Sequence, residues 1–187
     1  MKKSLYPPAV LKKARSIRLL AMDIDGVLTA GDVVVLNSGE EVKFWNVKDR
    51  IGFTMLRKSG KEFHFAWITG RGCNAVERAA REIGVQSLYQ QCWDKKKAFH
   101  ELLAKLRLNP EEAAYLGDDL IDVPVLRVAG LAVCPSDAPA HVKAVSHYAT
   151  RVPGGRGVFR ETVELILEAQ GLWPEVMRHF DPDAGSK

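Results

Sequence analysis

Residues 19–29 read Leu-Leu-Ala-Met-Asp-Ile-Asp-Gly-Val-Leu-Thr. This short apolar run ends at two carboxylates, Asp23 and Asp25, and a glycine follows at once. An apolar run before a turn is typical of a buried strand of a parallel sheet, and open α/β sheets bind ligands at the carboxyl ends of such strands. Because side chains alternate along a strand, we expect the two carboxylates to point the same way.

Two neighbouring carboxylates are costly to keep ionised unless a cation lies between them or one of them retains a proton. Asp23 and Asp25 are therefore candidates for metal binding combined with acid–base or nucleophilic chemistry. A solvated acidic turn and a calcium-binding loop are the alternatives. A calcium loop would need further oxygen ligands and a late glutamate, whereas two apolar residues and Thr29 come after Gly26.

The remaining chain alternates strand-like and helix-like segments. Buried strands are expected at residues 19–22, 63–68, 87–89, 113–116, 131–133 and 147–149. Helices are expected at residues 9–16, 49–58, 74–83, 94–106, 122–129, 138–144 and 158–169, with Asp49 as a helix cap. This alternation predicts βαβ units, and so an α/β fold with a doubly wound parallel sheet.

An insertion interrupts this pattern directly after the first strand. Two β-prone runs, residues 32–36 and 41–45, flank a turn-forming cluster and predict a β-hairpin. A plain surface hairpin is the alternative. It is disfavoured because four of its side chains are too apolar to be left in water, namely Val33, Val35, Phe44 and Trp45. We therefore expect the hairpin to be buried, either as a flap over the site or as an oligomer contact.

The 187 residues suffice for one domain that buries about 70% of the surface of its unfolded chain. With no repeat and no linker rich in Pro, Gly or Ser, we expect a single domain over residues 1–187, with a core at about 17–171 and a tail at 172–187. No insertion is large enough to serve as a cap domain.

Composition excludes several classes of function. The net charge is +4 and the basic residues are scattered, apart from residues 95–97, so no stripe for nucleic acid is formed. No apolar run approaches the length of a membrane span, and residues 1–8 carry the charge of a signal peptide without its apolar core. The three cysteines lie far apart and form no CxxC pair, which favours a reducing cytoplasm.

Polar side chains also follow the second and third core strands. Thr69 comes directly after one, Asp118 and Asp119 follow the other, and Lys95 lies at the start of a helix between them. Because parallel strands share one carboxyl edge, these residues can converge on Asp23 and the neighbouring carboxylate. Carboxylates, a hydroxyl and an ammonium suit a magnesium-bound phosphoryl group. Taken singly, each could instead be a turn residue, a solvated helix start or a helix cap.

Four motifs, Asp23-x-Asp25-Gly26-Val27, Thr69-Gly70-Arg71, Lys95 and Gly117-Asp118-Asp119, resemble those of haloacid dehalogenase superfamily phosphatases, in the same order. The resemblance implies that Asp23 is a nucleophile that forms an aspartyl-phosphate, and that Asp25 protonates the leaving alcohol and then activates water. It also implies that Thr69 and Lys95 hold the phosphoryl group. Mg²⁺ would be bound by Asp23, Asp25 through its backbone carbonyl, and Asp118, with Asp119 alongside and Asp122 in support.

Residues 37–49, 117–122 and 154–157 narrow the resemblance to the capless 3-deoxy-D-manno-octulosonate 8-phosphate phosphatases, over about residues 19–171. That family implies hydrolysis of the sugar acid phosphate in lipopolysaccharide precursor synthesis. It also implies a homotetramer whose hairpins assemble centrally and whose C-terminal segments close neighbouring sites. The substrate-binding residues implied are Gly70, Arg71, Lys48 and Arg156, since arginine binds carboxylate or phosphate through two parallel hydrogen bonds.

Two departures from the family pattern bear on substrate preference and not on phosphoryl chemistry. The chain has Lys48-Asp49-Arg50 where the family has Arg-Asp-Gly, and Gln91-Cys92-Trp93 where the family usually has Gly-Gln. One alternative is therefore a phosphatase for a nine-carbon sugar acid 9-phosphate, an N-acylneuraminate or its deaminated analogue. Arg71 favours the eight-carbon substrate, because the nine-carbon enzymes tend to carry glutamate there.

Two further alternatives belong to other functional classes. A receiver-type signalling domain also uses aspartates, threonine, lysine and magnesium on a doubly wound sheet. In receivers the lysine comes last, whereas here Lys95 precedes Asp118 and Asp119. A non-catalytic scaffold that kept the fold is the other alternative, and the presence of all four motifs argues against it.

Overall fold

The computed structural model describes residues 4–185, and its centre is a six-stranded sheet in the order β5-β4-β1-β6-β7-β8. Every neighbouring pair in this sheet is parallel. Its strands are β1 (Leu19–Met22), β4 (His64–Ile68), β5 (Ser87–Tyr89), β6 (Ala113–Leu116), β7 (Leu131–Cys134) and β8 (Tyr148–Ala149). The first strand therefore lies in the middle of the sheet, as its fully buried residues require.

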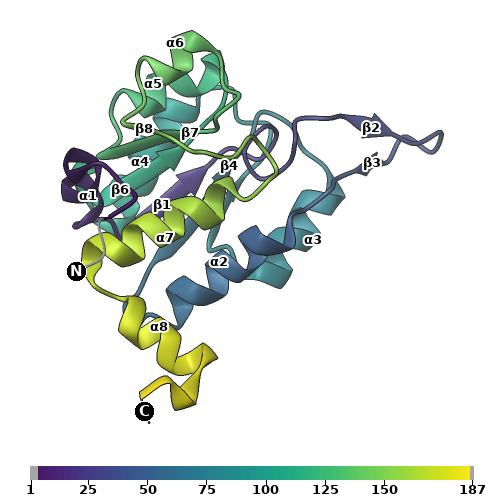
Figure 1. Cartoon of the computed structure of the whole chain (residues 1–187). Coiled ribbons are helices and arrows are strands. Elements are labelled where there is room, and N and C mark those ends of the chain that lie inside the picture. Colours follow the sequence, from purple (N-terminus) through teal and green to yellow (C-terminus); the bar gives the residue numbers. More distant parts are fainter. Residues whose placement is uncertain (1–3, 186–187) are drawn as a thin grey trace.

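Helices cover both faces of the sheet (Figure 1). One layer holds α1 (Pro8–Ala14), α2 (Val47–Arg57), α3 (Asn74–Ile83) and α7 (Val158–Gln170). The opposite layer holds α4 (Lys95–Leu106), α5 (Val123–Leu126) and α6 (Ala140–Lys143). Short 3₁₀ turns precede β6 and α5, namely η1 (Pro110–Glu112) and η2 (Leu120–Asp122). The predicted α/β fold with a doubly wound parallel sheet is thus confirmed.

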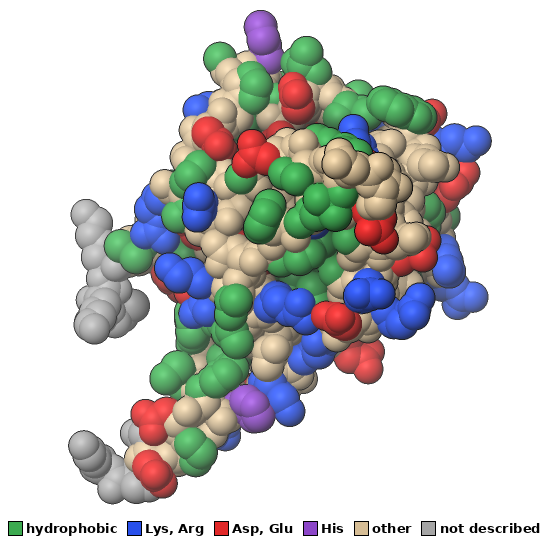
Figure 2. All heavy atoms as spheres, turned by 90° about the vertical axis from the view of Figure 1, so that its right-hand side faces the viewer, with side chains coloured by type: hydrophobic (Ala, Val, Ile, Leu, Met, Phe, Trp, Pro, Cys, Tyr) green, Lys and Arg blue, Asp and Glu red, His purple; other side chains and the backbone are tan. Residues whose placement is uncertain are grey.

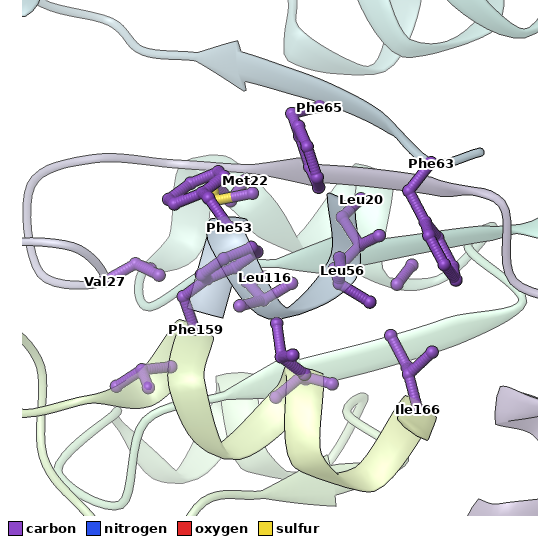
Figure 3. Packing of buried hydrophobic residues seen from close by; sticks show 14 of the residues in the cluster. Leu20, Met22, Val27, Phe53, Leu56, Phe63, Phe65, Leu116, Phe159 and Ile166 are labelled. Atoms are coloured by element: carbon purple, nitrogen blue, oxygen red, sulfur yellow. The ribbon is translucent and has the colours of Figure 1, made fainter. Parts of the chain in front are cut away.

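Alternation along β1 explains the two cores. Leu20 and Met22 pack into the layer of α2 and α7, whereas Leu19 and Ala21 pack against α4 and α5. Figure 3 shows the first of these cores, where side chains from β1, β4, α2 and α7 meet. Phe53 of α2 stacks on Phe159 of α7 with the ring centroids 4.0 Å apart. Such burial on both sides fixes the register of the central strand.

Two predicted helices differ from those in the structure. Helix α2 begins at Val47 and Asn46 is its N-cap, so the prediction of Asp49 as its cap was wrong. Asp49 instead accepts a hydrogen bond from the backbone N–H of Arg160, in the first turn of α7 (2.8 Å). The helix expected at residues 122–129 is only the single turn of α5, preceded by η2.

The inserted hairpin consists of β2 (Val34–Val35) and β3 (Glu41–Val42), and it projects away from the sheet (Figure 1). Its apolar side chains were expected to be buried, either as a flap or in an oligomer contact. In the single chain Trp45 is half-buried and stacks on Trp67 of β4, with the ring centroids 5.5 Å apart, whereas Val33 is 48% exposed. Val35 is 58% exposed and Phe44 is 69% exposed. The face from which the hairpin projects accordingly carries many hydrophobic side chains (Figure 2). Burial of this surface would require a partner.

The C-terminal segment adds α8 (Trp173–Phe180) and the short turn η3 (Pro182–Gly185), neither of which was predicted from the sequence. Val176 is buried and joins the core that α7 covers, so α8 is anchored to the domain. Within residues 4–185, none of the helices combines the length and the apolar character that crossing a membrane requires.

Candidate active site

The site begins where β1, β4 and β6 end side by side. Met22 of β1 pairs with Trp67 of β4 and with Leu116 of β6, so the residues that follow these strands emerge at one edge. Asp23 follows the first strand directly, and the backbone N–H of Asp23 donates to the carbonyl of Leu116 (2.9 Å). The structure thus brings the ends of three strands together, as the sequence predicted.

Three carboxylates gather at this edge. Asp23, Asp118 and Asp122 each place an oxygen within 4.8 Å of the other two. The ammonium of Lys95 joins two of them, at 3.0 Å from Asp23 Oδ2 and 2.8 Å from Asp122 Oδ1. Lys95 is the first residue of α4 and is 1% exposed. A buried ammonium between two carboxylates lowers the cost of placing these charges together.

Asp122 is the hydrogen-bond acceptor that links the other residues of this cluster. Its Oδ1 accepts from Lys95 and from the hydroxyl of Tyr115 (2.7 Å), and its Oδ2 accepts from the backbone N–H groups of Asp118 and Asp119. Both oxygens of Asp122 are therefore occupied by protein donors. By contrast, Asp23 Oδ1 and Asp118 Oδ1 are buried without a hydrogen-bond partner. Both of these oxygens are therefore open to a ligand.

The pKa values of the cluster also indicate that it can bind a cation. Burial, together with the nearby Asp122 charge, raises the pKa of Asp23 to about 7, although Lys95 acts in the opposite direction. Burial and the charges of Asp23 and Asp122 raise the pKa of Asp118 to about 8. For Lys95, burial alone would lower the pKa, but the two carboxylates outweigh it and the pKa is raised. Carboxylates held together in this way are stabilised by a further cation.

The unpartnered oxygens fit a magnesium ion. Mg²⁺ prefers oxygen ligands and is commonly held by one or two carboxylates while it keeps several waters. Asp23 and Asp118 supply two such carboxylates. The exposed Asp119 carboxylate lies outside the group of three and caps the turn η2 through the N–H of Leu120 (2.7 Å).

The side chain of Asp25 also lies outside the group of three, and it is held differently. Its Oδ1 accepts from Lys43 Nζ (2.5 Å) and from the hydroxyl of Thr29 (3.2 Å). Its Oδ2 is buried and has no partner. The carboxyl group is therefore fixed through one oxygen and free at the other.

Thr69 directly follows β4, at the same edge of the sheet as Asp23. It is 2% exposed, and its Oγ1 accepts a hydrogen bond from the backbone N–H of Arg71 (3.2 Å). Gly70 lies between them, and a Cβ there would be 3.7 Å from Ile121 Cδ1. Arg71 itself is exposed and forms an ion pair with Glu41 of β3 (2.5 Å), which holds the pKa of that glutamate below its usual range.

Lys48 and Arg156 are the remaining predicted site residues, and both are exposed. Lys48 lies in the first turn of α2, and its N–H donates to the N-cap Asn46. Arg156 belongs to the glycine-rich loop before α7. A Cβ on Gly154 of that loop would lie 2.1 Å from the carbonyl oxygen of Gly26, so the loop packs closely on the turn that carries Asp25.

Sequence reasoning missed several residues of the site. Lys43, Glu41 and Thr29 contact Asp25 or its neighbours, and Tyr115 supports Asp122. Tyr115 carried a signal, because it lies within an apolar run that predicts a buried strand, and a buried tyrosine hydroxyl usually needs a partner. Nothing in the local pattern around Lys43 distinguished it from any other charged residue in a hairpin.

Known proteins share both the sequence and this arrangement. A sequence model of the haloacid dehalogenase-like hydrolases matches residues 84–161. The chain is 46% identical over 161 residues to the 3-deoxy-D-manno-octulosonate 8-phosphate phosphatase of Yersinia pestis, covering 86% of this chain and 85% of that protein. It is 44% identical over 166 residues to the phosphatase of the same name from Escherichia coli K12, covering 89% and 87%.

Solved structures agree with these relatives. The crystal structure of the Yersinia pestis phosphatase superimposes with a TM-score of 0.86 at 44% identity, over 89% of each chain. The phosphatase of Moraxella catarrhalis, in complex with magnesium, phosphate and a KDO molecule, gives a TM-score of 0.90 at 36% identity. That comparison covers 94% of this chain and all of the other.

The fold and the carboxylate cluster define a haloacid dehalogenase-like hydrolase. The sequence identity of 44–46% over most of the chain identifies the family within this class more closely. The chain belongs to the 3-deoxy-D-manno-octulosonate 8-phosphate phosphatase family.

Proposed function

We propose that this chain is a magnesium-dependent phosphatase that hydrolyses 3-deoxy-D-manno-octulosonate 8-phosphate to the free sugar acid and phosphate, in lipopolysaccharide precursor synthesis. The observation that carries the proposal is the pair of buried, unpartnered oxygens, Asp23 Oδ1 and Asp118 Oδ1, beside the ammonium of Lys95. The substrate is supported by relatives of that name at 44–46% identity and by the KDO complex of the Moraxella protein.

In the proposed mechanism Asp23 is the nucleophile. One carboxylate oxygen attacks phosphorus, the bond to the sugar oxygen breaks, and an aspartyl-phosphate forms. Lys95 and Thr69 stabilise the negative phosphoryl oxygens, because their ammonium and hydroxyl groups lie at the same edge of the sheet. The 3.0 Å contact between Lys95 and Asp23 supports this assignment, since the ammonium already lies beside the attacking group.

Asp25 acts as the proton donor and acceptor. Its unpartnered Oδ2 gives a proton to the departing sugar oxygen, and then takes one from the water that attacks the aspartyl-phosphate. Hydrolysis of that acyl phosphate releases phosphate and restores Asp23. The opposite oxygen, Oδ1, stays bound to Lys43 and Thr29 throughout.

Mg²⁺ would be held by the carboxylates of Asp23 and Asp118 and by the backbone carbonyl of Asp25, with the charge of Asp119 nearby. When bound, the ion neutralises the phosphoryl oxygens and the repulsion between the carboxylates. Asp122 holds Asp118 in place because its Oδ2 accepts hydrogen bonds from the backbone N–H groups of Asp118 and Asp119.

The sugar acid end of the substrate is assigned to residues at the rim. Arg71 leaves 45% of its side chain exposed despite its ion pair with Glu41, so its guanidinium retains free donors. Arg156 and Lys48 add positive charge, and Gly70 lets the substrate approach the backbone. Arginine is suited to the carboxylate of the sugar acid through paired hydrogen bonds.

We assign the protein to the cytoplasm, as a homotetramer and as a single phosphatase domain over residues 1–187. The exposed apolar hairpin supports the assembly, because its largest side chains need a partner to leave water (Figure 2). The free thiols of Cys73, Cys92 and Cys134 support a reducing compartment. Analytical ultracentrifugation tests the assembly, and a monomer at micromolar concentration would contradict it.

The test of the function is phosphate release from a panel of sugar phosphates, with Mg²⁺ and with EDTA. We expect release from the eight-carbon substrate that EDTA abolishes, and much slower release from nine-carbon sugar acid 9-phosphates. A clear preference for a nine-carbon substrate would contradict the substrate assignment. A stable phosphoprotein without turnover would instead revive the receiver-type alternative.

A further inference from the structure

The base of the hairpin places a lysine against the proposed proton donor. Lys43 comes directly after β3, and its Nζ lies 2.5 Å from Asp25 Oδ1 and 3.5 Å from Glu41 Oε2. Only 2% of the Lys43 side chain is exposed, although the hairpin itself projects into solvent. The lysine is therefore directed into the site and away from the surface that its strand exposes.

The two oxygens of Asp25 are unequal as a result. Lys43 and Thr29 both donate to Oδ1, whereas Oδ2 is buried and has no partner. A carboxyl group anchored by two donors at one oxygen cannot rotate freely, so the other oxygen keeps a fixed direction. Proton transfer requires such a fixed direction, because donor and acceptor must meet within hydrogen-bond distance.

Stability alone is a poor explanation for this buried lysine. Charge pairs that are removed from water gain little, because the cost of desolvation offsets most of the attraction. The ion pair of Lys43 with Asp25 is also part of a longer series of ion pairs, since Glu41 contacts both Lys43 and Arg71. The chain Asp25–Lys43–Glu41–Arg71 thus joins the turn after β1, the hairpin and the loop after Thr69.

We propose that Lys43 is a positioning residue for proton transfer by Asp25, holding Oδ1 so that Oδ2 faces the oxygen of the departing alcohol. The inference rests on the proposed phosphatase function. In the first step the phosphorus–oxygen bond to the alcohol breaks, and the proton of Oδ2 moves to the alkoxide. Asp25 is left as a carboxylate paired with the ammonium of Lys43, which keeps its own protons. In the second step the same Oδ2 takes a proton from the attacking water.

This role predicts a dependence on the leaving group. A sugar alkoxide needs a proton as it departs, whereas p-nitrophenolate departs without one. Loss of the anchor should therefore slow the sugar phosphate more than p-nitrophenyl phosphate. The quantity to compare is kcat/KM, because it reports the steps up to formation of the aspartyl-phosphate and excludes its hydrolysis.

The experiment compares Lys43→Met with the unmodified enzyme on both substrates in saturating Mg²⁺. We expect kcat/KM for 3-deoxy-D-manno-octulosonate 8-phosphate to fall at least about tenfold further than that for p-nitrophenyl phosphate, out of the roughly 10²–10⁴-fold that proton transfer contributes. Lys43→Arg, which keeps a cationic donor, should restore part of the difference. If Lys43→Met does not fold, Lys43→Ala gives the same comparison, because it also removes the donor to Asp25.

Lys61→Met is the matched control, because Lys61 is exposed and bonded to Gln170, away from the strand ends. It should leave both values of kcat/KM unchanged. Equal losses on the two substrates, or no loss, in a folded variant that removes the donor (Lys43→Met or Lys43→Ala) would overturn the positioning role. Failure of the proposed function differs from this outcome, because the unmodified enzyme would then release little or no phosphate from 3-deoxy-D-manno-octulosonate 8-phosphate itself.

Discussion

The two ends of the site are held in different ways. At the end that we propose holds the phosphoryl group, the phosphoryl end, Asp122 accepts hydrogen bonds from Lys95, from Tyr115 and from two backbone N–H groups. At the end that we propose faces the departing alcohol, the leaving-group end, Asp25 accepts hydrogen bonds from Lys43 and Thr29. Asp122 therefore has enough donors to keep its orientation when the neutral hydroxyl of Tyr115 is lost, whereas Asp25 has only Thr29 besides the buried ammonium of Lys43.

The supports also come from different parts of the fold. Asp122 and its donors lie on or beside β6 and α4, inside the sheet and its helical layer. Lys43 lies at the base of a hairpin whose apolar residues are exposed in the single chain. A partner that covered the hairpin would therefore also bear on the position of Asp25, whereas the phosphoryl end is fixed by the domain alone.

Substitution of Asp23, the proposed nucleophile, should have the largest effect on activity. Asp23→Asn keeps the size of the side chain and an acceptor for Lys95, but it removes the attacking carboxylate. We expect kcat to fall by about 10⁴-fold or more with the far-UV circular dichroism and the melting curve preserved. An active Asp23→Asn enzyme would show that the nucleophile lies elsewhere.

Removal of the central ammonium should have the largest effect on stability. Lys95→Met leaves Asp23 and Asp122 facing each other without their cation, so the free energy of unfolding should drop by about 3 kcal/mol. Urea denaturation measures the change. Lys96→Met is the control, because this neighbour is exposed and should change stability by less than about 0.5 kcal/mol. Equal effects of the two variants would contradict the buried network.

The phosphoryl end was predictable because its information is local. An apolar run, a carboxylate or hydroxyl at its end, and the rule that parallel strands share one edge were enough to place Asp23, Thr69 and Asp118 together. The position of Lys95 at the start of a helix completed the set. Asp122 was expected nearby, but its many hydrogen bonds depend on the turn η2, whose geometry the sequence did not reveal.

The leaving-group end was not predictable because its contacts join distant segments. The ion pair of Lys43 with Asp25 depends on how the hairpin folds back, and that of Arg71 with Glu41 depends on the loop after β4. The same holds for Asp49, which interacts with the first turn of α7, far along the chain. The exposure of the apolar hairpin has a related cause, since burying its side chains requires surface that the single chain lacks.

A pH experiment tests one of these distant contacts. Burial raises the pKa of Asp49 from 3.8 to about 6, although backbone N–H groups of α7 act in the opposite direction. The folded state therefore binds this proton more tightly, and the resulting stability is present below about pH 4 and lost as the pH rises through 6. Asp49→Asn keeps an acceptor for Arg160 but removes the titration.

We expect the stability of Asp49→Asn relative to the unmodified protein to improve by about 2 kcal/mol between pH 4 and pH 7. Urea midpoints at several pH values, in EDTA, give this difference, and the other buried acids cancel because both proteins contain them. Glu40→Gln, at an exposed position of the hairpin turn, is the control and should give a flat difference. A flat difference for Asp49→Asn as well would show that its carboxyl is not perturbed by burial.

The smallest expected effect is the most direct measure of redundancy at the phosphoryl end. Tyr115→Phe removes one of the donors to Asp122 and leaves Lys95 and the two backbone N–H groups in place. Stability should fall by about 1 kcal/mol, the usual worth of one buried hydrogen bond. Because the remaining donors still orient Asp122, kcat/KM should change by less than about threefold, a small difference in free energy. A loss comparable to that of Lys43→Met would mean that the two ends of the site are equally fragile, and that the number of donors does not decide how firmly a catalytic carboxylate is held.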